Sequence, residues 1–239
     1  MTNAVQQLQA YIDQSKQIVF FGGAGGSTES GIPDFRSADG LFSQKYKYPP
    51  ERMISHSFFL THPEDFFDFY RDRVLHMDAD PNAAHRKLAE MEGTGKLTAI
   101  VTQNIDGLHQ KAGSENVLEL HGSIWRNYCI QCSKTYEAAI LKASTGIPRC
   151  VCGGVVRPDV VLYEESLDPI VLRQAEMYIR QADLLIVGGT SLAVYPAAGL
   201  LRFFHGDLVL INRSETPQDR RAALVMRESI GDVLGQIRC

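Results

Sequence analysis

Four cysteines in two close pairs constrain the fold of this chain more than any other feature of its sequence. Two residues separate Cys129 from Cys132, and after a further 17 residues one residue separates Cys150 from Cys152. Two thiolate pairs at this separation are typical of a tetrahedral four-sulfur zinc site in a ribbon-like module. Because sulfur would fill all four positions, we expect the zinc to be structural. The alternative is a set of buried free thiols, and Cys239 has no partner in either interpretation.

Short apolar runs alternate with amphipathic stretches along the rest of the chain. The apolar runs cover residues 17–21, 98–102, 183–189 and 207–212. Both faces of each run are apolar, as in parallel strands that helices cover on either side. Apolar residues recur at helical spacing over residues 5–15, 81–92 and 167–181. This alternation predicts an open α/β sheet.

Two segments interrupt the alternation. Residues 37–80 have helical pieces but no strand pattern, and residues 125–162 contain the cysteine pairs. We expect both to be insertions that form a smaller module beside the sheet. The sheet-bearing part would then comprise residues 1–36, 81–124 and 163–239 of a single domain.

Charge and hydropathy exclude several classes of partner. There are 24 basic and 28 acidic residues, a net charge of -4, and no polybasic run, so we expect neither a nucleic acid nor an anionic membrane as partner. No apolar run approaches the ~20 residues of a membrane span. The first residues are polar and lack the pattern of a signal peptide. A cytoplasmic location is expected.

A glycine-rich segment, residues 22–31 (GGAGGSTESG), follows the first apolar run and is expected to lead into a helix. Glycines there would let the backbone approach a pyrophosphate, and a helix N-terminus favours negative charge. The segment lacks the third glycine of GxGxxG, and no acidic residue follows about 20 positions later to bind a ribose. A plain turn is an equally good interpretation, and a hydride-transfer dehydrogenase is disfavoured.

Polar residues gather where the second apolar run ends. Gln103, Asn104 and Asp106 supply amide and carboxylate groups suited to sugar hydroxyls or a carboxamide. In open α/β sheets, ligands bind at this end of the strands. Capping of a following helix would explain Asn104 or Asp106 alone, but less readily all three residues.

Three further residues are candidates for chemistry. Phe35 could shield a reactive sugar from water and Arg36 could pair with a phosphate, although an aromatic plug and a surface arginine explain them equally. His121, followed by glycine at the end of an apolar stretch, is a candidate general base because its ordinary pKa is ~6.5. A lone histidine is more often structural. Residues 188–192 and 211–214 end the last two apolar runs and offer hydroxyl and backbone donors.

Taken together and in this order, these segments resemble the sirtuin family of NAD-dependent protein lysine deacylases, in its compact bacterial form. The matching segments are GAGGSTESGIPDFRS (23–37), TQNIDGLHQKAG (102–113), LHGS (120–123), the cysteine quartet, RPDVVLYEE (157–165), GGTSLAVYPAA (188–198) and IN (211–212). The resemblance covers nearly the whole chain. It implies a Rossmann-like sheet with a small zinc-ribbon and helical module, and a cleft in which NAD meets an acyl-lysine protein or peptide.

The resemblance also implies roles for individual residues. Ala24, Thr28, Phe35 and Arg36 would belong to the NAD-binding loop, Gln103, Asn104, Ile105 and Asp106 would hold nicotinamide and its ribose, and Gly189, Thr190, Ser191, Asn212 and Ile230 would contact the phosphates and adenosine. His121 matches the catalytic histidine, and we assign Asn104 to catalysis with it. Val160, Val161 and Leu162 match the strand that pairs with the substrate peptide. Two departures, Gly26 in place of a branched aliphatic residue and Leu162 in place of an aromatic, remove no catalytic group.

The reaction that the family performs differs from hydride transfer. The acyl oxygen attacks C1′ of the nicotinamide ribose, nicotinamide leaves, and the histidine then deprotonates a ribose hydroxyl that attacks the imidate carbon. The products are free lysine, nicotinamide and O-acyl-ADP-ribose. Mono-ADP-ribosyl transfer on the same scaffold is the main alternative, and a zinc-ribbon interaction module with a degenerate nucleotide site is another.

The acyl group that the chain removes is a separate question. Some sirtuins that remove succinyl or malonyl groups carry Tyr-x-x-Arg in the small module, and Tyr70 and Arg73 have this spacing. Positions i and i+3 share one face of a helix, so both side chains could enter one pocket. A packed tyrosine beside a surface arginine is an equally good interpretation. We therefore expect deacetylation and treat desuccinylation as an additional hypothesis.

Overall fold

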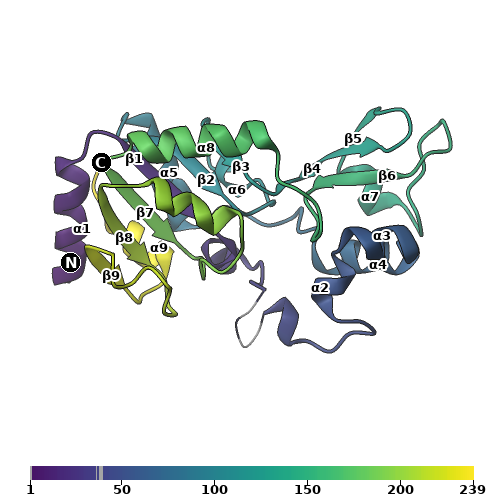
Figure 1. Ribbon diagram of the computed structural model, residues 1–239, viewed down its shortest axis with the longest axis horizontal. Coiled ribbons are helices and arrows are strands. Elements are labelled where there is room, and N and C mark those ends of the chain that lie inside the picture. The colour runs from purple at the N-terminus through teal and green to yellow at the C-terminus, as the bar shows by residue number, and fades with distance from the viewer. Residues whose placement is uncertain (1, 36, 38–39) are drawn as a thin grey trace.

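A six-stranded parallel sheet forms the larger part of the computed structural model, which describes residues 2–35, 37 and 40–239 (Figure 1). Its strands are β1 (Ile18–Gly22), β2 (Leu97–Thr102), β3 (Val117–Glu119), β7 (Leu184–Gly188), β8 (Asp207–Ile211) and β9 (Leu224–Met226). The spatial order is β3-β2-β1-β7-β8-β9. The chain winds outward in one direction from β1 and in the other from β7, so the winding reverses between these two strands. Ligands of open α/β sheets bind at such a reversal.

Helices cover both faces of this sheet, which explains why its central strands are apolar throughout. On one face, α8 (Pro169–Gln181) and the 3-10 helix η4 (Ala197–Phe203) bury Ile179 and Leu200 against the strands. On the other face lie α1 (Asn3–Gln14), α5 (Ala83–Gly93) and α9 (Ile230–Leu234), with Leu8, Leu88 and Val233 buried. The prediction of an α/β fold with a parallel sheet is confirmed.

Local sequence sets where α5 begins. The Asn82 side chain accepts hydrogen bonds from the backbone N–H groups of Ala84 and His85, and His85 Nδ1 lies 3.3 Å from the Asn82 backbone nitrogen, which forms a capping box for α5. The Asn82 amide also donates to the Gly26 carbonyl oxygen at 2.8 Å. The cap of α5 therefore fixes part of the glycine-rich segment as well.

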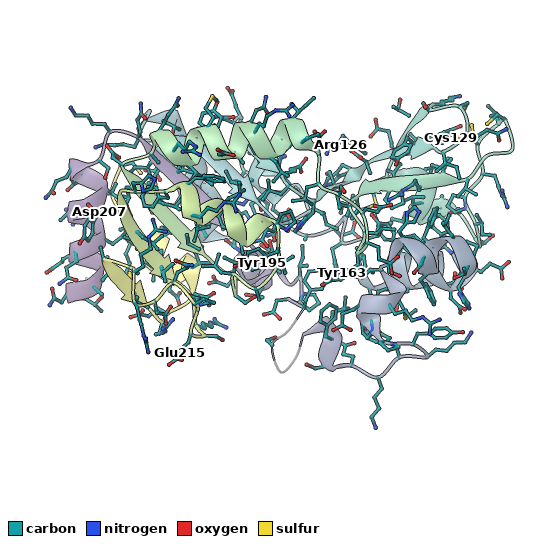
Figure 2. The ribbon with its side chains drawn as sticks, viewed as in Figure 1. Arg126, Cys129, Tyr163, Tyr195, Asp207 and Glu215 are labelled. Carbon is teal, nitrogen blue, oxygen red and sulfur yellow. The ribbon has the colours of Figure 1, made fainter. Side chains whose placement is uncertain are left out.

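A smaller, antiparallel sheet lies beside the first. It contains β4 (Gly122–Cys129), β5 (Thr135–Glu137) and β6 (Val156–Val160) in the order β5-β4-β6. The helices α2 (Pro50–Met53), α3 (His56–Thr61), α4 (Pro63–Arg73) and α7 (Ala139–Ala143) accompany it. Aromatic residues of α3 and α4 form the buried core here, and Figure 2 shows Cys129 at the end of the molecule away from the large sheet.

Within the described ranges, no helix has both the length and the apolar character that crossing a membrane requires.

Candidate active site

The candidate site forms where β1 and β7 end side by side. Gly22 pairs with Gly188 at the ends of these strands, and the Gly23 backbone N–H donates to the Gly188 carbonyl oxygen at 3.2 Å. The Gln103 backbone N–H donates to the Gly22 carbonyl oxygen at 3.0 Å, which adds the segment after β2. Three loops far apart in sequence therefore meet at one edge of the sheet.

Glycines allow two of these loops to touch. The Gly25 N–H donates to the Gly189 carbonyl oxygen at 2.8 Å, and a Cβ at Gly25 would lie 2.9 Å from both Cα and the carbonyl oxygen of Gly189. Contact at this distance leaves no room for a side chain on the facing edges. Backbone without side chains would also allow a diphosphate to approach closely.

The prediction that a helix follows the glycines is wrong in detail. Two 3-10 turns occur instead, η1 (Ala24–Gly26) and η2 (Thr28–Ser30), and the Thr28 hydroxyl donates to the Gly25 carbonyl oxygen at 3.1 Å. Glycines disfavour a regular helix because of the backbone entropy they lose. The segment therefore presents no long helix dipole to an anion, and the backbone N–H groups of Gly25, Gly26 and Ser27 already donate to backbone carbonyl oxygens.

The polar loop after β2 is tied to both glycine-containing loops. Gln103 Nε2 donates to the Thr190 hydroxyl at 3.0 Å, and Asn104 Nδ2 donates to the Ser27 hydroxyl at 2.9 Å. The Ser27 hydroxyl in turn donates to the Asp106 carboxylate at 2.6 Å, and both residues are buried. Ser27 lies within a motif that the sequence singled out, but nothing in its type marked it as the link between Asn104 and Asp106.

His121 lies directly before β4, beside this polar loop. Its Nδ1 is 2.9 Å from the backbone carbonyl oxygen of Gln103. Because a carbonyl oxygen can only accept, Nδ1 carries the proton and Nε2 keeps its lone pair. Burial lowers the pKa of His121 below its ordinary 6.5, and the bond to Gln103 opposes that shift only in part. The imidazole is therefore neutral and basic at Nε2 near neutral pH.

Three more of the expected nucleotide contacts lie around the ends of β7 and β8. Ser191 is exposed directly after Thr190, and the Asn212 amide donates to the Ser214 carbonyl oxygen at 2.8 Å. Ile230 begins α9, and its Cδ1 would be 2.2 Å from a Cβ at Gly188. All three therefore border the same edge of the sheet as the glycine loops.

The segment after η2 joins the site to the small sheet. Phe35 is half-buried, and its ring centroid lies 5.4 Å from that of Phe42. Arg36 lies outside the described residues, so its expected phosphate contact has no structural counterpart here.

The expected substrate strand borders His121 directly. Val160 pairs with Gly122, and the Val161 backbone N–H donates to the His121 carbonyl oxygen at 3.0 Å. Val160 and Leu162 are buried, whereas Val161 is half-exposed. β6 (Val156–Val160) ends at Val160, so Val161 and Leu162 lie beyond the strand, and the backbone of Val161 lies beside the histidine.

The structure does not bring Tyr70 and Arg73 into one pocket. Tyr70 is buried against Phe66 in the aromatic core, and its hydroxyl has no hydrogen-bond partner among the described residues. Arg73 lies at the surface, where it pairs with Asp72 at 2.6 Å and its guanidinium lies 5.6 Å from the centre of the Tyr46 ring. The two side chains therefore have different surroundings, since Tyr70 is buried in the aromatic core and Arg73 is exposed to solvent.

The four cysteines form a compact cluster in the small sheet. The sulfur of Cys152 lies 3.5 Å from that of Cys129 and 3.4 Å from that of Cys132, and the sulfurs of Cys132 and Cys150 are 3.6 Å apart. A tetrahedron of sulfurs around zinc, with bonds of ~2.3 Å, has edges of about 3.8 Å. The cluster therefore has nearly the dimensions that a structural zinc site needs.

The chemistry of the cysteine cluster also suits a cation. The Cys152 backbone N–H and the Tyr136 hydroxyl lower the pKa of Cys150 to about 6. At Cys152 the backbone N–H of Gly154 lowers the thiol pKa, but the neighbouring sulfurs outweigh it and raise the pKa to about 12. Thiolates crowded in this way repel one another unless a metal ion neutralises them. The four cysteines are thus a candidate structural zinc site.

Comparison with known proteins places these features in one family. The family model described as "Sir2 family" matches residues 23–196. A protein of Clostridium acetobutylicum described as "NAD-dependent protein deacetylase" is 57% identical, with 98% of each chain covered. A protein of Clostridium perfringens with the same description is 56% identical, with 99% of each chain covered.

Solved structures match the fold as well. One described as "Sir2-p53 peptide-NAD+" has a TM-score of 0.85 and 38% identity, and the match covers 96% of this chain and 95% of the other. Another, a Sir2 complex with an inhibitor, 2′-O-acetyl-ADP-ribose and a deacetylated p53 peptide, has a TM-score of 0.86 and 36% identity, with the same coverage.

Proposed function

This chain belongs to the Sir2 family, and we propose that it removes acetyl groups from lysine side chains of proteins with NAD as its co-substrate. The chain is accordingly an NAD-dependent protein deacetylase. The observation that carries the assignment of its base is the 2.9 Å bond from His121 Nδ1 to the Gln103 carbonyl oxygen, at the edge of the sheet where the winding reverses.

We assign some residues of the site to NAD binding and others to proton transfer. Bound NAD would supply the ADP-ribose that accepts the acyl group, with nicotinamide as the leaving group. The facing glycines of the β1 and β7 loops carry no side chains, so the diphosphate could approach their backbone closely. The polar loop 103–106 would hold the nicotinamide half through its amides and the Asp106 carboxylate. We assign the adenosine side to the edge bordered by Asn212 and Ile230.

His121 is the proposed base, with Asn104 beside it. The lone pair on His121 Nε2 would take the proton of a ribose hydroxyl, because His121 Nδ1 carries a proton and donates it in the hydrogen bond to the Gln103 carbonyl oxygen. A positioned base of this kind contributes ~10²–10⁴-fold to the rate. Asn104 is held by Ser27, and we propose that it orders the ribose or the attacking water.

The acyl-lysine peptide is proposed to bind along residues 160–162. The backbone bond from Val161 to His121 supports this placement, since it puts the strand next to the base. We keep the division into a sheet-bearing part and a small module as part of this proposal, with the peptide between them. Removal of succinyl groups, read by Tyr70 and Arg73, is a further hypothesis that the separation of these side chains weakens.

The test is an incubation of purified protein with NAD and an acetyl-lysine peptide, followed by mass spectrometry. We expect NAD-dependent free lysine together with O-acetyl-ADP-ribose, both lost in His121→Ala. NAD cleavage with ADP-ribose attached to protein, and without deacetylation, would instead establish mono-ADP-ribosyl transfer. No NAD consumption with any acyl peptide would overturn the proposal.

A further inference from the structure

Trp125, the single tryptophan of the chain, lies on β4 directly behind the polar loop 103–106. Its indole Nε1–H donates to the backbone carbonyl oxygen of Asp106 at 2.7 Å. The preceding residue, Ile124, donates its backbone N–H to the carbonyl oxygen of Ile105 at 2.9 Å. Two successive residues of β4 therefore hold two successive carbonyl groups of the loop, and one of these bonds depends on a side chain.

The indole also packs against the peptide that follows Asp106. A Cβ at Gly107 would lie 2.7 Å from both Cδ1 and Nε1 of Trp125, and Gly107 has a φ of +73°. Residue 107 must therefore be glycine for two reasons, the left-handed backbone and the space that the indole occupies. The indole therefore lies in direct contact with the backbone where the chain leaves the loop.

Asp106 is consequently held from both sides. On the inner side its carboxylate accepts hydrogen bonds from the Ser27 hydroxyl at 2.6 Å and from the Leu108 backbone N–H at 2.9 Å. On the outer side its carbonyl oxygen accepts only the Trp125 bond among the described contacts. Loss of the indole N–H would leave this carbonyl without its protein partner and free the 106–107 peptide to rotate.

We infer that Trp125 is a positioning residue that fixes the orientation of the loop 103–106 toward the nicotinamide half of NAD, without touching the substrate itself. This inference rests on the proposed function of that loop. Preorganised donors act in binding and catalysis only when their orientation is fixed in advance. The effect of Trp125 should therefore appear in nicotinamide binding and release rather than in peptide binding.

Trp125 lies where its N–H can be removed by substitution with little effect on packing. Its side chain is 36% exposed and borders a surface pocket of about 400 Å³, with Lys111, Glu119 and Arg126 among the other lining residues. Because the outer face of the indole is not packed against protein, Trp125→Phe keeps the ring over Gly107 and creates no closed cavity. The variant removes the N–H with little expected change in folding.

The experiment compares wild type, Trp125→Phe and Tyr128→Phe, which removes a polar aromatic atom elsewhere on β4. Steady-state assays give kcat, the KM values for NAD and acetyl-peptide, and the inhibition constant for nicotinamide. Exchange of labelled nicotinamide into NAD is measured in parallel. We expect Trp125→Phe to raise the nicotinamide inhibition constant and slow exchange by about tenfold, with the KM for peptide within about twofold of wild type. Tyr128→Phe should change neither.

Intrinsic fluorescence gives a second readout, because all tryptophan emission comes from one site beside the loop. Titration of the wild type with nicotinamide and NAD should change the emission of Trp125. An unchanged inhibition constant and exchange rate in Trp125→Phe would overturn the inference. It would also be overturned if kcat, both KM values and the inhibition constant all worsened to a similar extent and the melting temperature fell. A wild type that neither cleaves NAD nor exchanges nicotinamide would instead overturn the proposed function.

Discussion

His121 Nδ1 lies 2.9 Å from the backbone carbonyl oxygen of Gln103, so one bond joins the candidate base to the loop that we propose holds nicotinamide. The bond fixes both the tautomer and the direction of the imidazole. It also couples base and loop mechanically, since Gln103 is itself bonded to Thr190 at 3.0 Å. Under the proposed roles, proton transfer and leaving-group binding would depend on one hydrogen-bonded unit.

The pH dependence of the reaction should follow from the burial of His121. The base works only when neutral, and burial lowers its pKa below the ordinary 6.5. Activity should therefore persist as pH falls through 6.5 and decline only at lower pH, where Nε2 becomes protonated. A profile of kcat/KM against pH reports this group in the free enzyme. An acidic limb centred above 6.5 would contradict the assignment.

Substitution of His121 separates catalysis from binding. His121→Ala should lower kcat by ~10²–10⁴-fold, since a positioned base contributes that much. Calorimetric titration should show that NAD still binds. His205→Ala removes an exposed histidine and is the matched control. Equal losses in both variants would show that His121 has no special role.

Metal removal should unfold the small module rather than block a chemical step. Cys150→Ser is expected to reduce bound zinc from one equivalent to nearly none and to lower the midpoint of thermal unfolding by about 10 °C or more. Zinc is measured by elemental analysis and unfolding by circular dichroism. Cys239→Ser, outside the cluster, should change neither quantity. Full zinc content in Cys150→Ser would show that this sulfur is not a ligand.

Sequence patterns predicted the central sheet well because burial on both faces leaves a clear signal. The expected strand at residues 207–212 is β8, Asp207–Ile211. The outer strands β3 and β9 were not predicted, since each has three residues and a partly exposed edge position. Three apolar residues do not distinguish a strand from a turn.

Motifs identified the residues that we expect at the site but not their contacts with one another. Gln103 and Thr190 are 87 positions apart, and only the placement of β2, β1 and β7 in neighbouring order brings them within 3.0 Å. The roles of Ser27 and Trp125 depend on the same long-range arrangement. No local spacing encodes it, because a glycine-rich turn and a tryptophan in a strand are each compatible with many folds.

Desuccinylation should depend on Arg73 if the Tyr-x-x-Arg hypothesis holds. Arg73→Met would then lower the rate on a succinyl-lysine peptide by about tenfold or more and leave the acetyl rate within about twofold, because only the succinyl group carries a carboxylate. Arg71→Met is the matched control, since Arg71 on the same helix bonds to the Gly146 carbonyl oxygen instead. An unchanged succinyl rate in Arg73→Met would remove the hypothesis.

An ion pair behind the substrate strand should contribute to stability in a pH-dependent way. Glu165 accepts hydrogen bonds from Arg157 at 2.7 Å and from the Leu162 backbone N–H at 2.8 Å. Burial raises the pKa of Glu165, but these bonds outweigh it and hold the pKa at about 2, below the ordinary 4.5. The stabilisation is therefore complete above about pH 4.5 and lost as pH falls through about 2.

Glu165→Gln tests this contribution. At neutral pH the variant should be less stable by about 2 kcal/mol, which is less than a fully buried pair would lose because solvent reaches part of the site. Urea unfolding at several pH values measures the difference, which should shrink as the pH is lowered. Glu215→Gln, at an exposed position, should have no effect. A difference independent of pH would show that packing, and not charge, explains the loss.

The contact between the two glycine-containing loops should control NAD binding. Gly25→Ala would place a Cβ 2.9 Å from the Gly189 backbone, so the loops must separate and the proposed diphosphate site would change shape. We expect the Kd for NAD to rise about tenfold or more, measured by calorimetry, with the melting temperature of the unliganded protein changed much less. Gly26→Ala is a closely matched control, because a Cβ there meets no atom within 4 Å. Equal affinity for NAD in both variants would show that the interlocked loops do not form the diphosphate site.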